Sequence, residues 1–175
     1  MKASVSKGEI GGRVEAPPSK SYTIRGLVCA ALAEGESEIV CPLPSDDTEA
    51  ALRVLSQVGV RICQEGDSWR VGGGRFRRPD ADLFCGDSAA TLRFMTALCS
   101  LVPGRCRLVA GSSLGRRPVG PLVAALKKWG VSCSARGEVA PVVVDGGLKG
   151  GADRDGGQYQ LSVRLGLTVR RPPGQ

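Results

Sequence analysis

The sequence predicts an α/β (α+β) fold made of a repeated unit, and three observations support this. The expected elements occur twice in the order helix-strand-helix-strand-strand. The 25 glycines among 175 residues indicate many tight turns between short elements. Matched landmarks keep a nearly constant spacing, which is 68 residues for Arg25 and Arg93, 69 for Gly35 and Gly104, and 71 for Gly59 and Gly130. One such unit cannot bury its apolar faces alone, so we expect the two units to pack together.

The first expected elements lie between residues 2 and 35. Residues 2–16 alternate in polarity between glycine breaks, which predicts two short strands. Pro17 and Pro18 then precede a helix that Ser19 caps and that ends before Gly35. The apolar residues of this helix recur at helical spacing and are Leu27, Ala30, Ala31 and Ala33.

Three polar residues, Lys20, Ser21 and Arg25, lie in the first turn and a half of this helix, behind the rigid proline pair. The free N–H groups and the positive dipole end of a helix beginning favour a bound anion. The pattern therefore predicts a site for a phosphate or a carboxylate. The alternative is an ordinary amphipathic helix whose Lys20 and Arg25 are solvated.

The remaining elements complete the two units. The first unit continues with a strand at Ser37–Val40, a helix that a capping box of Asp46 and Glu49 opens and that stops at Gly59, and strands at Val60–Cys63 and Trp69–Val71. The second unit has a helix at Ser88–Leu101, a strand at Cys106–Val109, a helix at Val119–Trp129, and strands at Val131–Ser134 and Val142–Val144. The residues expected to face the core are Ala50, Leu52, Leu55 and Val58 in one helix and Leu92, Met95 and Leu98 in another. If the first helices of the two units are parallel, Asp87, Ser88 and Arg93 share one anion-binding face with Lys20.

Composition narrows the chemistry. The absence of histidine removes imidazole general bases and the Cys-His and Ser-His mechanisms. The seven cysteines include no C-x-x-C pair and lie mostly in apolar segments, which favours buried, reduced thiols in a cytoplasmic protein over a metal site or disulfides. The net charge of +7 is spread along the chain and aromatic residues make up only 4%, so we expect small anions rather than nucleic acid as partners. No apolar run is long enough to predict a membrane span.

Three motifs follow one another in the chain. They are Ser19-Lys20-Ser21-Tyr22-Thr23-Ile24-Arg25, then Cys85-Gly86-Asp87-Ser88-Ala89-Ala90-Thr91-Leu92-Arg93-Phe94, then Arg116-Arg117-Pro118-Val119 with Leu122. With these motifs the chain resembles the 5-enolpyruvylshikimate-3-phosphate synthase family from Met1 to about Asp155. The resemblance implies an enolpyruvyl-transferase-like inside-out α/β barrel, incomplete here. Residues 1–18 would be opening strands of a first lobe, and residues 19–155 would be two of three units of a second lobe, at about 19–85 and 86–155.

The resemblance also implies an activity, the transfer of the enolpyruvyl group from phosphoenolpyruvate to the 5-hydroxyl of shikimate 3-phosphate in the shikimate pathway of aromatic amino acid biosynthesis. It implies no metal and no organic cofactor. The expected partners are these phosphorylated small molecules, without nucleic acid or membrane, and the complete protein is expected to be a cytoplasmic monomer. By the same resemblance, Lys20 is catalytic and contacts both substrates, Ser21 and Arg25 bind shikimate 3-phosphate, Ala89 and Arg117 lie at phosphoenolpyruvate, and Asp87, Ala90 and Arg93 support them.

Residues 87–90 depart from the corresponding turn of the family. The four positions of that turn usually hold Asn or Glu, then Ser or Ala, then Gly, and then Thr. Ala89 stands where the family has glycine, and its methyl group narrows the space next to phosphoenolpyruvate. The family associates alanine at this place with tolerance of the inhibitor glyphosate, so we expect tolerance in a complete enzyme with this turn. Ala90 lacks the threonine hydroxyl of the family pattern.

The tail at residues 156–175 also departs from the family, which continues with a Ser-Ser-Gln-Tyr segment that binds both substrates. Gln158-Tyr159 matches only the end of that segment. Codons can be chosen for residues 157–175 whose second reading frame encodes Val-Asn-Ile-Ser-Ser-Gln-Tyr-Val-Ser-Ala-Leu-Leu. We therefore predict a one-base frameshift near Gly156, in the gene or in its sequencing, followed by an off-frame tail. A chain of this kind is expected to be inactive alone.

Two other interpretations stay open. The related UDP-N-acetylglucosamine enolpyruvyl transferase shares the implied fold, but that family resembles Lys-Asn where this chain has Lys20-Ser21. A non-catalytic module that binds phosphate or nucleic acid is supported by the net charge alone.

Overall fold

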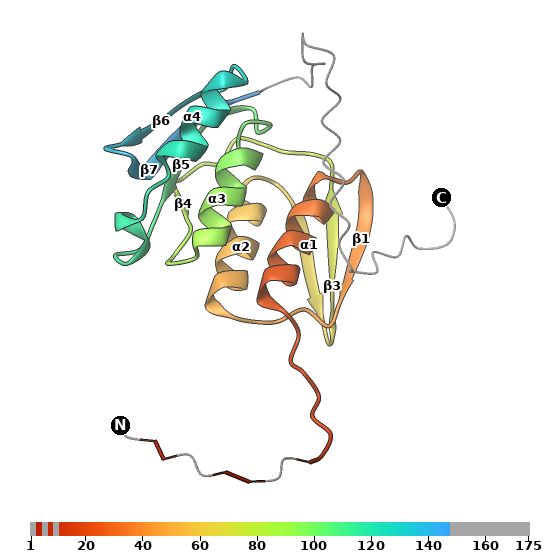
Figure 1. The fold of residues 1–175 in the computed structure, drawn as a ribbon. Coiled ribbons are helices and arrows are strands. Elements are labelled where there is room, and N and C mark those ends of the chain that lie inside the picture. Colours follow the sequence, from red (N-terminus) through yellow and green to blue (C-terminus); the bar gives the residue numbers. More distant parts are fainter. Residues whose placement is uncertain (1–2, 5–6, 9–10, 148–175) are drawn as a thin grey trace, which may run out of the picture.

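The computed structural model describes residues 3–4, 7–8 and 11–147 (Figure 1). The first unit comprises α1 (Lys20–Leu32), β1 (Gly35–Val40), α2 (Asp46–Gln57), β2 (Arg61–Glu65) and β3 (Ser68–Gly73). The second comprises β4 (Leu83–Phe84), α3 (Ala89–Leu98), β5 (Gly104–Val109), the 3-10 turn η1 (Leu114–Arg116), α4 (Gly120–Lys128), β6 (Ser132–Arg136) and β7 (Val139–Gly146). Both units have the expected order of elements, and β4 and η1 are additions that the sequence pattern did not predict.

The two units form sheets of the same topology. The first sheet has the strand order β1-β3-β2 and the second has β4-β5-β7-β6, so β5, β7 and β6 take the places of β1, β3 and β2. These equivalent neighbours are antiparallel, whereas β4 pairs in parallel with β5. Gly35 pairs with Gly73 in the first sheet, and Gly104 pairs with Gly146 in the second. The predicted internal repeat is confirmed, and the sheets of the described residues do not close into a barrel.

Two equivalent glycines allow the central strand of each unit to approach the end of its first helix. A Cβ atom at Gly73 would lie 2.1 Å from the carbonyl oxygen of Ala30, and one at Gly146 would lie 2.0 Å from that of Val102. In both units the following residue also donates its N–H to a carbonyl at this helix end. Because no other residue tolerates such a distance, both positions require glycine.

Helices α1, α2 and α3 lie side by side, with the first sheet beside α1 and α2 and the second beside α3 and α4 (Figure 1). The residues expected to face the core in α2 and α3 are all buried. In α1, Leu27, Ala30 and Ala31 are buried as expected, but Ala33 follows the last helical residue and is exposed. The largest fully buried side chains include Ile24, Leu27, Ile39, Leu55, Leu83, Leu92, Met95, Leu108 and Leu114.

The predicted capping box of α2 was wrong by one residue. Ser45 is the N-cap, since its hydroxyl accepts a hydrogen bond from the Thr48 N–H at 3.4 Å while its own N–H donates to Thr48 Oγ1 at 2.8 Å. Ser45 provides the acceptor that the prediction assigned to the next residue. Asp46 and Glu49 instead lie in the first helical turn, where the helix dipole favours negative charge.

Two further expectations differ from the structure. Helix α3 ends at Leu98 rather than Leu101, because the N–H groups of Ser100 and Leu101 bond to carbonyls three residues back and tighten the chain into turns. The described residues between 2 and 16 are exposed and form no strand, since no neighbouring strand of the described chain pairs with them. The other residues of that segment lie outside the described ranges.

The cysteines follow the expectation in part. Cys85, Cys99, Cys106 and Cys133 are buried and Cys29 is half-buried, whereas Cys41 and Cys63 are exposed, and all of them are free thiols. Burial raises the pKa of the Cys85 thiol to about 12, so this thiol stays protonated at neutral pH. Within the described ranges, no three His, Cys, Asp or Glu side chains gather as a metal site would require. No described helix has the length and apolar character needed to cross a membrane.

Candidate functional site

Three serines begin three parallel helices at one end of the molecule. Ser19, Ser45 and Ser88 are the N-caps of α1, α2 and α3, and each hydroxyl accepts a hydrogen bond from the N–H three residues later, at 3.4, 3.4 and 3.2 Å. Each of the three helices begins at its lower end in the view of Figure 1. Their dipoles therefore add at this end and favour negative charge. The parallel arrangement expected for α1 and α3 is present, and α2 contributes a third helix beginning.

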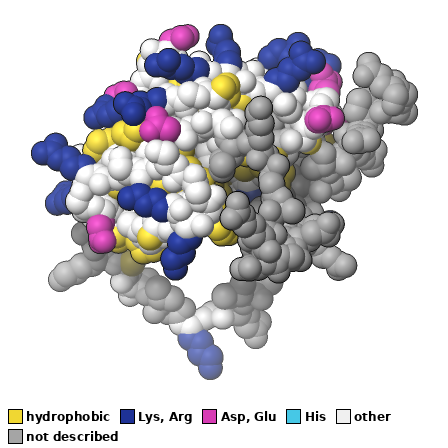
Figure 2. Space-filling view, turned by 90° about the horizontal axis from the view of Figure 1, so that it is seen from above, with side chains coloured by type: hydrophobic (Ala, Val, Ile, Leu, Met, Phe, Trp, Pro, Cys, Tyr) yellow, Lys and Arg dark blue, Asp and Glu magenta, His cyan; other side chains and the backbone are white. Residues whose placement is uncertain are grey.

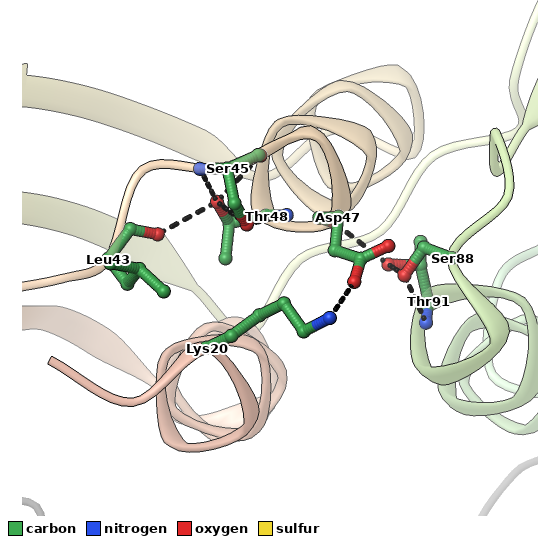
Figure 3. Close-up of polar contacts among 7 residues, drawn as sticks. All are labelled: Lys20, Leu43, Ser45, Asp47, Thr48, Ser88 and Thr91. Carbon is green, nitrogen blue, oxygen red and sulfur yellow. Dashed lines mark hydrogen bonds and ion pairs between the residues drawn. The ribbon is translucent and has the colours of Figure 1, made fainter. Parts of the chain in front are cut away.

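Lys20 connects these helix beginnings (Figure 3). Its Nζ forms an ion pair with Oδ2 of Asp47 in the first turn of α2. The backbone carbonyl of Asp47 in turn accepts a hydrogen bond from Oγ1 of Thr91 in α3, at 3.1 Å. The Lys20 side chain is 49% exposed, so a solute can reach its ammonium group. Side chains from α1, α2 and α3 thus meet in one contact chain.

Thr23 and Thr48 fix the loop between β1 and α2 against α1. Oγ1 of Thr23 donates to the Ser19 carbonyl at 3.0 Å and accepts from the Leu43 N–H at 2.9 Å. Oγ1 of Thr48 donates to the Leu43 carbonyl, also at 2.9 Å (Figure 3). Both threonines are buried, so water competes little with these hydrogen bonds. The loop therefore holds Asp47 in a defined position opposite Lys20.

Arg25 reaches from α1 to α3. Its guanidinium carbon lies 5.5 Å from the centroid of the Phe94 ring, and its Nη1 donates to the Ser21 carbonyl at 3.0 Å. A cation over an aromatic face contributes about 0.5–1 kcal/mol at an exposed site. Ser21 and Arg25 are both exposed, so the guanidinium is held in place and remains accessible to a ligand.

Arg93 links the first turn of α3 to the segment with Arg117. Its Nη1 donates to the Ala89 carbonyl at 3.3 Å, and its Nη2 donates to the Pro118 carbonyl at 3.2 Å. Arg117 directly precedes Pro118, follows the last residue of η1 as its C-cap and is exposed. The second and third motifs of the sequence are therefore joined by direct contact.

Asp87 anchors the same segment from another side. Its Oδ1 accepts hydrogen bonds from the backbone N–H groups of Ser113 and Leu114, at 3.1 and 2.8 Å. Gly111 gives this carboxylate room, because a Cβ at residue 111 would lie 2.6 Å from Oδ1. One oxygen of Asp87 is thus used to hold the beginning of η1, a contact that the sequence did not reveal.

Ala89 and Ala90 are the first two residues of α3 and are half-buried against the core. They share this helix beginning with Ser88 and Thr91, whose hydroxyls are 2.8 Å apart. All the site residues expected from the sequence therefore belong to three segments, residues 20–25, 87–93 and 117–118. Contacts through Asp47, Phe94 and Pro118 connect these segments.

Asp47, Thr91 and Phe94 have contacts in the site that sequence reasoning missed. The pair Asp46-Asp47 marks the start of a helix, but its spacing alone does not show which carboxylate faces Lys20. Only the packing of α1 against α2 decides this. Phe94 follows Arg93 in the second motif, and its position beside Arg25 depends in the same way on the packing of α1 against α3.

At the opposite end of the molecule, the visible described residues show no comparable convergence. Figure 2 looks onto that end, where Lys and Arg side chains are dispersed among Asp and Glu rather than gathered in one patch on the visible face. Several arginines of the described chain are also paired with acids, namely Arg70 with Glu65, Arg105 with Asp145 and Arg107 with Asp82. The guanidinium of Arg105 holds the pKa of the Asp145 carboxyl below its usual range.

Comparison with known proteins identifies the family of this chain. The family model for EPSP synthase (3-phosphoshikimate 1-carboxyvinyltransferase) matches residues 5–160. The 3-phosphoshikimate 1-carboxyvinyltransferase of Dehalococcoides mccartyi is 48% identical over 149 residues, which cover 84% of this chain and 35% of the relative. That of Methanothermobacter thermautotrophicus is 43% identical over 177 residues, which cover 98% of this chain and 42% of the relative. The solved EPSP synthase of Acinetobacter baumannii has the same fold, with a TM-score of 0.72 at 24% identity over 78% of this chain and 32% of that chain.

This chain spans only 35% to 42% of the length of these curated relatives. The family match includes residues 156–160, whereas the whole of the expected off-frame tail lies outside the described residues, so the frameshift stays a prediction. The match contains all three motifs and most of the chain. The family expected from those motifs is thus confirmed, and the chain belongs to the EPSP synthase family.

Proposed function

We propose that this chain forms part of an enzyme that transfers the enolpyruvyl group from phosphoenolpyruvate to the 5-hydroxyl of shikimate 3-phosphate, with release of phosphate. The observation that carries the proposal is the convergence of three helix beginnings on Lys20, with Arg25 and Arg93 beside them. Both substrates are anions, and cationic side chains at helix N-termini bind such groups well. The names of the family and of its relatives support the same reaction.

The proposed roles follow the positions of the side chains. Lys20 is the catalytic residue and contacts both substrates, because its accessible ammonium lies where three helix dipoles add. Ser21 and Arg25 bind shikimate 3-phosphate, Arg117 and Ala89 lie at phosphoenolpyruvate, and Asp87, Ala90 and Arg93 support this second subsite. Asp87 does so by fixing the segment before Arg117, and Arg93 by holding the residue after it.

The reaction forms a C–O bond between the 5-hydroxyl oxygen and the enol carbon of phosphoenolpyruvate and breaks the bond from that carbon to the phosphate oxygen. The proton of the 5-hydroxyl is lost and, in the overall balance, leaves with the released phosphate. Two anions must come together for this to occur, and their repulsion is offset by fixed cations and helix dipoles. Holding both substrates side by side also converts a reaction between separate molecules into one within a complex.

The transfer reaction is assigned to the whole protein, of which this chain spans about two fifths or less. For this chain we expect binding of shikimate 3-phosphate without turnover. We further propose that the complete enzyme is a cytoplasmic monomer that uses no cofactor and binds no nucleic acid.

Calorimetric titration with shikimate 3-phosphate tests the proposal. We expect saturable binding that Lys20→Ala abolishes. Lys127→Ala is the matched control, since it removes one lysine from the last turn of α4 and leaves the helix beginnings intact. Equal binding by wild type and Lys20→Ala would refute the site, and phosphate release by this chain with both substrates would refute the expected lack of turnover.

A titration with unrelated DNA at two salt concentrations tests the alternative of a nucleic-acid-binding module. Strong binding that weakens steeply with salt would favour that alternative, because release of counterions makes such binding salt-dependent. We expect no such binding.

A further inference from the structure

Asp47 makes two contacts, one through its side chain and one through its backbone (Figure 3). Its carboxylate pairs with the Lys20 ammonium of α1, and its backbone carbonyl accepts a hydrogen bond from Thr91 of α3. Its own helix begins with the Ser45–Thr48 capping box, and Asp47 lies between these two residues. The backbone position of Asp47, from which the carboxylate extends, is therefore set by contacts that do not depend on Lys20.

The ion pair is a weak source of stability. The side chains of Lys20 and Asp47 are 49% and 25% exposed, and ion pairs near the surface contribute little to the free energy of folding. A lysine side chain has four flexible carbons and samples many rotamers when its ammonium is unpaired. The main effect of the pair is thus on where the ammonium lies.

We infer that Asp47 is a positioning residue for Lys20, which keeps the ammonium at the meeting point of the α1, α2 and α3 N-termini, ready for an anionic group of the substrate. The identity of that substrate rests on the proposed function, whereas the positioning of Lys20 rests on the contacts above. Preorganisation of this kind reduces the ordering cost of binding.

Loss of the Asp47 charge and loss of the Lys20 position should change the affinity for an anion in opposite directions. This difference makes the inference testable. A carboxylate close to the site repels an anion, so loss of its charge alone should leave binding equal or tighter. Loss of positioning should weaken binding. Asp46 is a matched control because it precedes Asp47 in the same helical turn, is exposed, and takes part in none of the ion pairs of the described residues.

The first measurement needs no ligand. In a chain labelled with ¹⁵N-lysine, the ammonium signal of Lys20 is assigned by its absence in Lys20→Arg. We expect this signal to be visible in the wild type, Asp46→Asn and Asp47→Glu at low temperature, because a paired ammonium exchanges its hydrogens slowly with water. It should broaden beyond detection in Asp47→Asn. A signal that persists unchanged in Asp47→Asn would overturn the inference.

The second measurement is a titration with shikimate 3-phosphate. We expect Asp47→Asn to weaken binding on the order of 2- to 5-fold, and Asp46→Asn to leave it equal or slightly tighter. Binding by Asp47→Asn as tight as by Asp46→Asn would contradict positioning.

Circular dichroism verifies that each variant is folded, and Asp47→Ser, which suits a first helical turn, replaces Asp47→Asn in both measurements if that variant fails to fold. If the wild type does not bind shikimate 3-phosphate, the proposed function fails for this chain. The ligand-free ammonium signal then still decides whether Asp47 positions Lys20, so the two failures are distinguishable.

Discussion

Replacement of Asp87 by alanine should release the turn that precedes Arg117. Its Oδ1 accepts backbone hydrogen bonds from Ser113 and Leu114, at 3.1 and 2.8 Å. Hydrogen bonds to a charged acceptor contribute about 1.5–3 kcal/mol each when they are sheltered, and since Asp87 is exposed we expect about 1–3 kcal/mol for the two together. Local opening of this turn should then become roughly 5- to 150-fold more frequent.

Amide hydrogen exchange measured by NMR reports this opening directly. The amides of Ser113 and Leu114 should exchange faster in Asp87→Ala by that factor, and much less so in Asp87→Asn, which keeps a carbonyl acceptor. Asp80→Ala is the control, because it removes an exposed aspartate outside these hydrogen bonds. Unchanged exchange at residues 113 and 114 in Asp87→Ala, or an equal acceleration in Asp80→Ala, would refute the anchoring role.

Three other variants test separate contacts. Phe94→Leu removes the ring next to Arg25 and should weaken shikimate 3-phosphate binding about 2- to 5-fold in a calorimetric titration, which corresponds to the usual contribution of an exposed cation–π contact; an unchanged affinity would contradict this role. Gly146→Ala places a Cβ 2.0 Å from a backbone carbonyl oxygen and should lower the free energy of unfolding, measured in urea, by about 2 kcal/mol or more. Gly115→Ala is the control, because its Cβ meets open space, and it should change this free energy by less than about 0.5 kcal/mol. Similar values for the two glycine variants would show that the close approach is not required. Ala89→Gly in a complete enzyme with this turn should increase its sensitivity to glyphosate in an inhibition assay, and no gain in sensitivity would count against the steric argument.

Much of the fold could be predicted because its signals are local. A serine cap placed the start of α1, apolar residues at helical spacing placed α1 and α3, and the spacing of Gly35, Gly59 and their equivalents predicted the repeat. The structure adds a third pair of equivalent glycines, at 73 and 146, whose role depends on contact between a strand and a helix end. That contact joins distant parts of the chain and leaves no local signal beyond the glycine itself.

Within the site, only residues that belong to a sequence motif could be predicted. Lys20 and Arg25 could be chosen because cations near a helix beginning are a local pattern, and Arg117 was implied by the family resemblance of its motif. The partners Asp47 and Phe94 could not be chosen, because they depend on how α1 packs against α2 and α3. The capping of α2 was predicted one residue late because adjacent serine and aspartate residues both suit an N-cap.

The central claim is that the helix beginnings of the two units form neighbouring subsites for two phosphorylated substrates, and chemical-shift mapping of the backbone amides tests it most directly. With shikimate 3-phosphate added stepwise, we predict saturable shifts at residues 20–25, with smaller shifts at residues 88–93 and near residue 117. Shifts confined to the arginine-rich loop at residues 75–78, or no saturable shifts at all, would contradict the account.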